Sequence, residues 1–139
     1  MSYLLDTNIC IYALNGSDAG VLERLRRAKR SELCVSSVTI AELYFGAARS
    51  GRAKKNAQRV RTFVAPLAEV AFDRKAAEAY GAARAKLAAR GRQIGTMDML
   101  IAATALGHGL VMVTNNEREF QRVSGLRVEN WASGAAGGG

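Results

Sequence analysis

The chain of 139 residues contains one histidine, two cysteines and one proline. Because His108 is the single histidine and stands between two glycines, a zinc centre with several histidine ligands is excluded and a Ser-His-Asp triad is disfavoured. Cys10 and Cys34 are far apart in the sequence and form no Cys-x-x-Cys pair, so we expect two small buried thiols in a reducing compartment. The cytoplasm is therefore the expected location.

Long apolar segments are also missing. No run of residues is long and apolar enough to span a bilayer, and the first residues carry neither a basic leader nor an apolar stretch of signal length. We therefore expect no contact with membranes. The length suits one domain with a sizeable core, which we place over residues 1–131, followed by a flexible glycine-rich tail over residues 132–139.

Acidic residues are too few to balance the charge, since 12 aspartates and glutamates face 20 lysines and arginines, a net charge of +8. The segment from Val21 to Phe63 holds 11 basic and three acidic residues, so the rest of the chain is neutral. Such a basic field is typical of a protein that binds a polyanion, most often nucleic acid, although solvated helix surfaces explain it equally well. The candidate phosphate contacts are Arg24, Arg27, Arg49, Arg52, Lys54 and Lys55.

Short apolar runs alternate with helical patterns along the chain, which predicts an α/β fold with a largely parallel sheet and helices on its faces. The strand-sized runs cover residues 3–5, 33–36, 67–72, 110–113 and 126–128. The helical patterns cover residues 20–30, 39–50, 53–64, 74–90 and 97–106. Asp73 and Thr96 stand just before two of these helices and are predicted to cap them.

Acidic residues follow several of the predicted strands. In open α/β sheets, ligands bind beyond the carboxyl ends of the strands. Asp6 closes the first strand, Asp98 begins an almost wholly apolar helix, and a polar run from Thr114 to Phe120 follows the fourth strand. Glu42 lies in the helix after the second strand, at the margin of a packed face that we assign to Val38, Ala41 and Phe45.

If these acids converge, they form a pocket that is unstable by itself. Two like charges about 4 Å apart repel by roughly 4 kcal/mol at an effective dielectric constant near 20. The pocket must therefore hold protons or a hard cation, and oxygen ligands without histidine or cysteine select Mg²⁺ or Mn²⁺. Taken singly, each acid is better explained as a cap, a turn residue or a surface glutamate, with Asn8 as a helix cap and Thr7 able to orient a carboxylate.

Three kinds of protein fit these observations. A metal-dependent nuclease uses both the carboxylate pocket and the basic segment, because a divalent ion activates water and stabilises the charge on a phosphodiester. A basic module that binds nucleic acid or a partner without catalysis would use the acids only as caps and ion-pair partners. A metal-dependent phosphatase would need the acids but not so extended a basic segment.

Four segments, residues 3–8, 36–46, 98–103 and 113–120, resemble the four signature blocks of the PIN-domain ribonucleases. More narrowly, they are similar to the VapC toxins of bacterial type II toxin–antitoxin modules, and the resemblance runs from Tyr3 through Trp131. It implies a three-layer α/β/α sandwich around a parallel sheet and an endoribonuclease that depends on Mg²⁺ or Mn²⁺. A PIN nuclease that is not a toxin would carry the same blocks.

The resemblance also implies roles for individual residues. Asp6 and Asp98 match the principal metal ligands, and Glu42 matches the acid that completes the metal site or positions water. Many members have an aspartate where this chain has Asn116, so Glu119, three residues later, is the implied fourth acid, with Thr114 and Asn116 in support. The implied reaction is the attack of activated water on an RNA phosphodiester.

The partners implied by the resemblance are RNA, a cognate VapB antitoxin and a second copy of the chain. Related VapC toxins cut structured RNA such as tRNA, and this chain looks closest to those that act on initiator tRNA. The larger toxin–antitoxin complex is expected to reach operator DNA only through the antitoxin. The segment from Val38 to Val64 is implied to form part of the dimer face and antitoxin groove, although its apolar residues are also explained as core; they are Tyr44, Phe45, Val60 and Phe63.

Overall fold

The computed structural model describes residues 2–133. Its centre is one sheet of parallel strands in the order β3-β2-β1-β4-β5. The strands are β1 (Tyr3–Leu5), β2 (Leu33–Ser36), β3 (Ala68–Val70), β4 (Val111–Val113) and β5 (Val128–Glu129). From β1 the chain adds β2 and then β3 on one side, and afterwards β4 and β5 on the other side of β1. The topological switch point therefore lies between β1 and β4.

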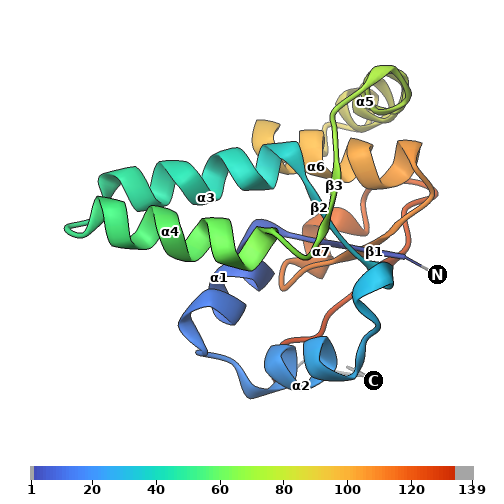
Figure 1. The fold of residues 1–139 in the computed structure, drawn as a ribbon. Coiled ribbons are helices and arrows are strands. Elements are labelled where there is room, and N and C mark those ends of the chain that lie inside the picture. The colour runs from blue at the N-terminus through green and yellow to red at the C-terminus, as the bar shows by residue number, and fades with distance from the viewer. Residues whose placement is uncertain (1, 134–139) are drawn as a thin grey trace.

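Helices connect the strands, as Figure 1 shows, and their positions confirm all five helical patterns predicted from the sequence. They are α1 (Thr7–Asn15), α2 (Ala19–Arg27), α3 (Ser37–Arg49), α4 (Ala53–Val64), α5 (Arg74–Ala89), α6 (Thr96–Gly107) and α7 (Glu117–Phe120), with a 3-10 turn at Arg30–Glu32. The sequence reading gave no bounds for α1 and did not predict α7. Among the described residues, no helix is both long and apolar enough to span a bilayer.

Side-chain caps set most helix starts. Asp73 accepts a hydrogen bond from the backbone N–H of Ala76 at 3.0 Å, which confirms the predicted cap of α5. Asp18 and Ser36 cap α2 and α3 in the same way, whereas Asp6, the N-cap of α1, accepts from the N–H of the next residue, Thr7. The predicted cap at Thr96 is wrong, because α6 begins one residue earlier and its N-cap is Gly95, without a side-chain hydrogen bond.

Successive residues of the strands point to opposite faces of the sheet, and each face has its own core. Leu5, Val35 and Val113 pack with α1, α2, α3 and α4 on one face. Leu4 and Met112 pack with α5, α6 and α7 on the other. The three-layer α/β/α architecture is therefore confirmed. Cys10 and Cys34 are both free and buried, one in each core, as predicted.

The α3–α4 pair forms a hairpin that extends beyond the sheet (Figure 1). Its buried residues correct the packed face assigned from the sequence. Thr39, Leu43 and Ala47 are the residues of α3 that face the protein core. Ala41 is exposed, and Phe45 is 63% exposed. These buried residues recur every four positions and form the side of α3 that packs against α1 and α4. The sequence alone does not show which of two adjacent apolar stripes meets those helices.

The chain stays packed beyond the predicted domain boundary at residue 131. Ala132 is buried, and its backbone N–H donates to Asn130 Oδ1 at 2.9 Å. The Ser133 N–H and hydroxyl both donate to the Asp18 carboxylate, at 2.9 and 3.0 Å from Oδ1. The expected flexible tail therefore does not begin at Ala132, because the start of α2 binds the segment; the rest of that tail, residues 134–139, lies outside the described residues.

Candidate active site

Asp6 occupies the switch point of the sheet, directly after β1. Its side chain is 4% exposed, and it accepts hydrogen bonds from the Thr7 N–H and the Thr114 hydroxyl, both at 2.8 Å. Thr114 follows β4, the strand next to β1, so two neighbouring strand ends hold one carboxylate in place. Burial raises the pKa of Asp6; the two hydrogen bonds oppose the rise, and the charge of Glu42 adds to it.

Glu42 reaches this edge of the sheet from α3. The Thr7 hydroxyl donates to Glu42 Oε1 and lies 3.1 Å from the Thr39 hydroxyl oxygen, so three side chains from α1 and α3 form one hydrogen-bonded group. Thr39 is fully buried. The sequence reading missed Thr39, although its position three residues before Glu42 places both on one side of the helix.

Asp98 and Glu119 complete the group of acids. Asp98 lies in the first turn of α6, whose N-cap supplies no side-chain hydrogen bond. Glu119 lies in α7 and accepts a hydrogen bond from the Asn116 side-chain amide at 2.8 Å, while the Asn116 N–H donates to the Thr114 hydroxyl at 2.9 Å. Asn116 therefore links Glu119 to the hydroxyl that holds Asp6.

The four carboxylates act on one another electrostatically. Burial, then repulsion from Asp6, Glu119 and Glu42, raises the pKa of Asp98 to about 6. Within residues 2–133, none of the four lies within 4.0 Å of a lysine, arginine or histidine side-chain nitrogen. The structure thus brings the four predicted acids into one uncompensated negative field.

The oxygen atoms around the four acids belong to carboxylate, hydroxyl and amide groups, which are suitable ligands for a hard divalent cation. In the described part of the chain, no three acidic, histidine or cysteine side chains form a closed group around a metal position. Three of the acids instead bind the hydroxyl or amide groups of Thr7, Thr114 and Asn116. The chemistry of the residues fits a cation, while their coordination geometry is open.

Asn8 does not take the role expected for it. The helix begins at Thr7 with Asp6 as its N-cap, so Asn8 lies inside the first turn of α1, where it is exposed. Among the hydrogen bonds described for residues 2–133, none joins Asn8 to the acids. With Asn8 as its cap the helix would begin at Ile9, two residues later than it does; Asp6, for which a capping role was one of the alternatives, takes the N-cap position instead.

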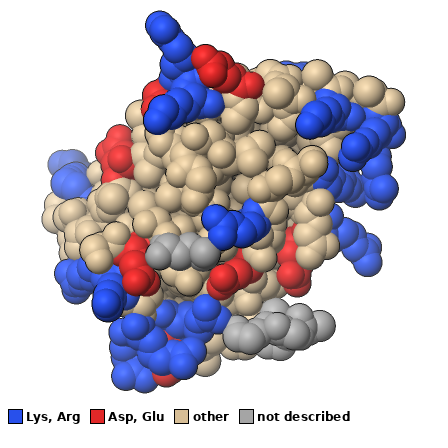
Figure 2. Space-filling view, turned by 90° about the vertical axis from the view of Figure 1, so that its right-hand side faces the viewer, with Lys and Arg blue, Asp and Glu red and all other residues tan. Residues whose placement is uncertain are grey.

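The basic segment does not fold into one surface. Its residues divide between α2 with the turn that follows it and the α3–α4 hairpin, which lie at separate places in Figure 1. Figure 2 shows a further face on which lysine and arginine side chains gather in separate groups, with acidic side chains between some of them. Of the candidate phosphate contacts, the hairpin group contains Arg49, Arg52, Lys54 and Lys55.

Arg24 has a different environment from the other candidates. Its guanidinium lies 3.2 Å from Glu129 Oε1 and 4.8 Å from the ring centroid of Trp131, which itself donates to Glu129 at 2.9 Å. Arg24 thus ties α2 to the end of the sheet, and its phosphate contact stays a prediction. Arg27 is exposed and lies 3.7 Å from Glu23.

We expect Arg24→Ala to lower the free energy of unfolding by about 1 kcal/mol, because it removes a partly buried ion pair and a cation–π contact. RNA affinity should change by less than about twofold. Chemical denaturation and equilibrium RNA binding measure the two quantities. Arg27→Ala is the matched control and should leave the unfolding free energy within about 0.5 kcal/mol. A selective loss of RNA affinity in Arg24→Ala would support its predicted phosphate contact.

Comparisons with known proteins agree with this geometry. Residues 3–126 match the PIN domain family. The chain is 42% identical over 132 residues to a tRNA(fMet)-specific endonuclease VapC from Shigella flexneri, which covers 95% of this chain and 99% of that protein. A Ribonuclease VapC2 from Haemophilus influenzae is 40% identical over 131 residues, 94% of this chain and 98% of that protein.

A solved structure of similar fold is DNA-bound VapBC from Salmonella typhimurium, with a TM-score of 0.89 and 39% identity over 95% of this chain and 99% of that chain. Another is VapBC2 from Rickettsia felis bound to a promoter DNA fragment, with a TM-score of 0.87 and 36% identity over 94% and 99%. The resemblance seen in the four sequence segments is confirmed: this chain belongs to the PIN-domain family and, within it, to the VapC ribonucleases.

Proposed function

We propose that this VapC ribonuclease is the toxin of a VapBC-type module and cleaves structured RNA, with initiator tRNA as its substrate and Mg²⁺ as its cation. Mn²⁺ is the expected substitute, because it accepts the same oxygen donors. The observation that carries the proposal is the uncompensated field of Asp6, Glu42, Asp98 and Glu119, in which the pKa of Asp98 rises to about 6. The substrate assignment is supported by the similarity to the Shigella flexneri tRNA(fMet)-specific endonuclease.

In this proposal Asp6, Asp98 and Glu42 hold the cation, and Glu119 lies beside them as a further acid. The cation would supply the positive charge that activates water and stabilises the phosphodiester during cleavage. The protein's own contribution is orientation. Thr7 engages Oε1 of Glu42, which leaves Oε2 to act on the cation or on water, and Thr114 fixes Asp6 Oδ2 through its hydroxyl.

The hairpin group supplies phosphate contacts in the same proposal. We expect the triple variant Arg52→Ala, Lys54→Ala and Lys55→Ala to weaken RNA binding about tenfold at low salt. The slope of log affinity against log salt concentration should decrease in magnitude by about 2. With fewer phosphate contacts, binding of the variant releases fewer counterions from the RNA. Binding titrations at several salt concentrations measure both effects.

The matched control removes three exposed cations from α5, with Arg74→Ala, Lys75→Ala and Lys86→Ala. Both triple variants lose the same formal charge, so a purely long-range effect would weaken binding equally. Equal slopes for the two variants would contradict a direct role of the hairpin group.

Protein partners follow from the same family membership. We propose that a VapB-type antitoxin binds this chain, that the chain forms a homodimer, and that operator DNA is bound only through the antitoxin. Support comes from the similar VapBC complexes solved with DNA. Tyr44, Val60 and Phe63 are buried or packed against the core. Of the four residues predicted to take part, Phe45 is thus the exposed one, with Arg49 over its ring at 5.3 Å.

The proposed function is tested by mapping the 5′ ends of cellular RNA after brief expression of the wild type and of Asp98→Asn. New ends within initiator tRNA should be found only with the wild type, and purified initiator tRNA should be cut at the same position in Mg²⁺. Cleavage without growth arrest would indicate a PIN nuclease that is not a toxin. Calorimetric titration that detects no carboxylate-dependent Mg²⁺ site would indicate a binding module without catalysis.

A further inference from the structure

A cleft of about 240 Å³ opens beside the acidic site, between α1, α3 and α4. Glu42 lines both the cleft and the site, so the two are continuous. Apolar side chains form much of the wall, among them Leu14 and Ile11, whose side chain is 38% exposed. Asn56 and Arg59 line the wall contributed by α4. Asn15 of α1 also lines the cleft, so a ligand bound to the acids meets an open, mainly apolar space with one polar side chain from α1 and two from α4.

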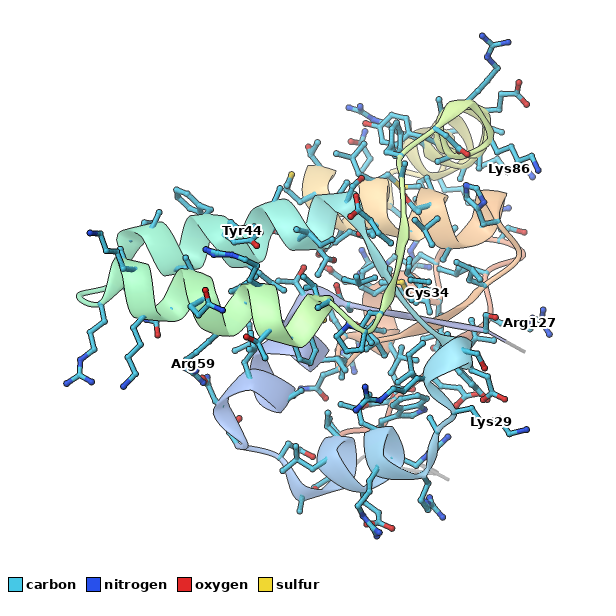
Figure 3. The ribbon with its side chains drawn as sticks, viewed as in Figure 1. Lys29, Cys34, Tyr44, Arg59, Lys86 and Arg127 are labelled. Atoms are coloured by element: carbon cyan, nitrogen blue, oxygen red, sulfur yellow. The ribbon has the colours of Figure 1, made fainter. Side chains whose placement is uncertain are left out.

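A chain of hydrogen bonds fixes the two polar groups of α4. Arg59 donates to the backbone carbonyl of Leu14 and, at 3.4 Å, to Asn56 Oδ1. The Asn56 side-chain amide donates to the Ser50 hydroxyl at 2.8 Å, and that hydroxyl donates to the Ala47 carbonyl at 2.7 Å. Figure 3 shows Arg59 between α4 and α1. The guanidinium and amide thus have fixed orientations before any ligand arrives.

Gly46 lies on the α3 side of the cleft and is not explained by the fold of the chain. It stands inside a helix, where glycine is less stable than alanine by up to about 1 kcal/mol. Its φ is not positive, and a Cβ added there would meet no atom within 4 Å. Within residues 2–133, neither backbone conformation nor packing requires a glycine, whereas a ligand that approaches the helix backbone in the cleft would.

The chemistry of the cleft favours a nucleobase as that ligand. Proteins recognise RNA by stacking unpaired bases on apolar or guanidinium surfaces and by hydrogen-bonding their edges. The cleft offers an apolar wall, an amide and a guanidinium, and the hairpin that forms two of its sides carries the basic residues Arg52, Lys54 and Lys55. Positive charge suits an acidic peptide as well as RNA, but the cleft is continuous with the acids that are proposed to cut RNA, which favours a base of the substrate over a peptide segment.

We propose that this cleft binds one unstacked base of the RNA substrate next to the phosphodiester that is cut. Gly46 provides the space for the base, while Asn56 and Arg59 face its polar edge. The proposal rests on the ribonuclease function proposed above and adds to it a base-binding subsite that determines where the chain is cut. Cleavage would require a base that can leave its stack at one position of the substrate.

The test measures binding of the inactive Asp98→Asn protein to a short single-stranded oligoribonucleotide in Mg²⁺ buffer. A series of oligonucleotides carries an abasic ribose at one position at a time. We expect base removal at a single position to weaken binding about tenfold, which is about 1.4 kcal/mol. When Gly46→Leu is added to fill the cleft, the intact oligonucleotide should bind about tenfold more weakly, and the effect of the abasic position should vanish.

Gly81→Leu in the same background is the matched control. Gly81 is also an exposed helical glycine with no atom within 4 Å of an added Cβ, but it lies in α5 and does not line the cleft. This variant should keep the affinity and the position effect. Gly46→Ala should not lower the melting temperature, since it removes a helical glycine without a clash; this measurement separates cleft filling from misfolding.

The outcomes separate the two proposals. Cleavage of RNA by the wild type together with an abasic effect that persists in Gly46→Leu overturns the base subsite alone. Loss of antitoxin affinity in Gly46→Leu with unchanged RNA affinity also overturns it and assigns the cleft to the antitoxin. A wild-type chain that neither cleaves nor binds RNA overturns the ribonuclease proposal and the subsite with it.

Discussion

Asp98→Asn is expected to abolish RNA cleavage, by about a thousandfold or more, and at the same time to stabilise the folded chain in the absence of metal. Under the proposed function, activity should be lost because the amide cannot supply the negative charge that would hold the cation. Stability is gained because the wild-type carboxylate is repelled by Asp6, Glu119 and Glu42 and is partly buried. We therefore expect this one substitution to have opposite effects on activity and stability.

The pH dependence gives the sign of the stability change. The pKa of Asp98 rises from its ordinary value of 3.8 to about 6 in the folded chain, so the folded state binds this proton more tightly than the unfolded state. Stability therefore falls as the pH rises through this window, and the full penalty is present at neutral pH. A shift of this size corresponds to at most about 3 kcal/mol. Partial exposure of the side chain to solvent reduces the expected gain to about 1 kcal/mol.

Chemical denaturation in a metal chelator, at about pH 4 and about pH 7.5, measures this difference. The variant and the wild type should be nearly equal at the lower pH, and the variant should be more stable at the higher one. Glu78→Gln, which removes an exposed acid from α5, controls for net charge. Added Mg²⁺ should stabilise the wild type and not Asp98→Asn. Wild-type cleavage by the variant would overturn the site assignment, and lower stability at neutral pH would overturn the repulsion argument.

The features predicted well from the sequence depend on local pattern. The α4 helix begins and ends at the predicted residues, and Asp73 caps α5 as predicted, because periodicity and capping involve neighbours in the chain. Convergence of Asp6 and Glu42 was predictable for a related reason: parallel strands end at one edge of the sheet, so residues just beyond them meet there.

The features that the sequence did not predict depend on contacts between distant segments. Phe45 is exposed because α1 and α4 cover the adjacent stripe of α3. Arg24 is held by Glu129 and Trp131, more than a hundred positions away. Thr39 supports the site only through Thr7, from another helix. In each case the residue type was visible, but the partner was set by the packing of the whole domain.

Substitution of Asp6 separates its two roles, since we expect both Asp6→Asn and Asp6→Ala to abolish RNA cleavage but only Asp6→Ala to destabilise the fold. The carboxylate caps α1 and accepts the Thr114 hydroxyl bond inside the protein. Alanine leaves two buried donors without an acceptor and removes a helix cap, which should lower the free energy of unfolding by about 2 kcal/mol.

Asparagine keeps an oxygen for the Thr7 N–H and turns its amide toward the Thr114 oxygen, so most of the hydrogen bonding survives. Asparagine also removes a buried charge, whose unfavourable burial raises the pKa of Asp6 in the wild type. The stability gained by removing this charge offsets the stability lost through weaker hydrogen bonds. We therefore expect Asp6→Asn to stay within about 1 kcal/mol of the wild type. Chemical denaturation and cleavage of purified tRNA measure the two properties on the same samples.

Asp18→Ala is the matched control for the structural role. Asp18 caps α2 and binds Ser133 with the same type of hydrogen bonds, but it lies outside the acidic group. Its substitution should lower stability by about 1 kcal/mol and leave cleavage unchanged. If Asp6→Asn cleaves RNA at the wild-type rate, the Asp6 charge has no catalytic role and its burial is structural. If Asp6→Asn folds stably and is inactive, the chain retains a buried charge at the switch point for chemistry, against the stability of the fold.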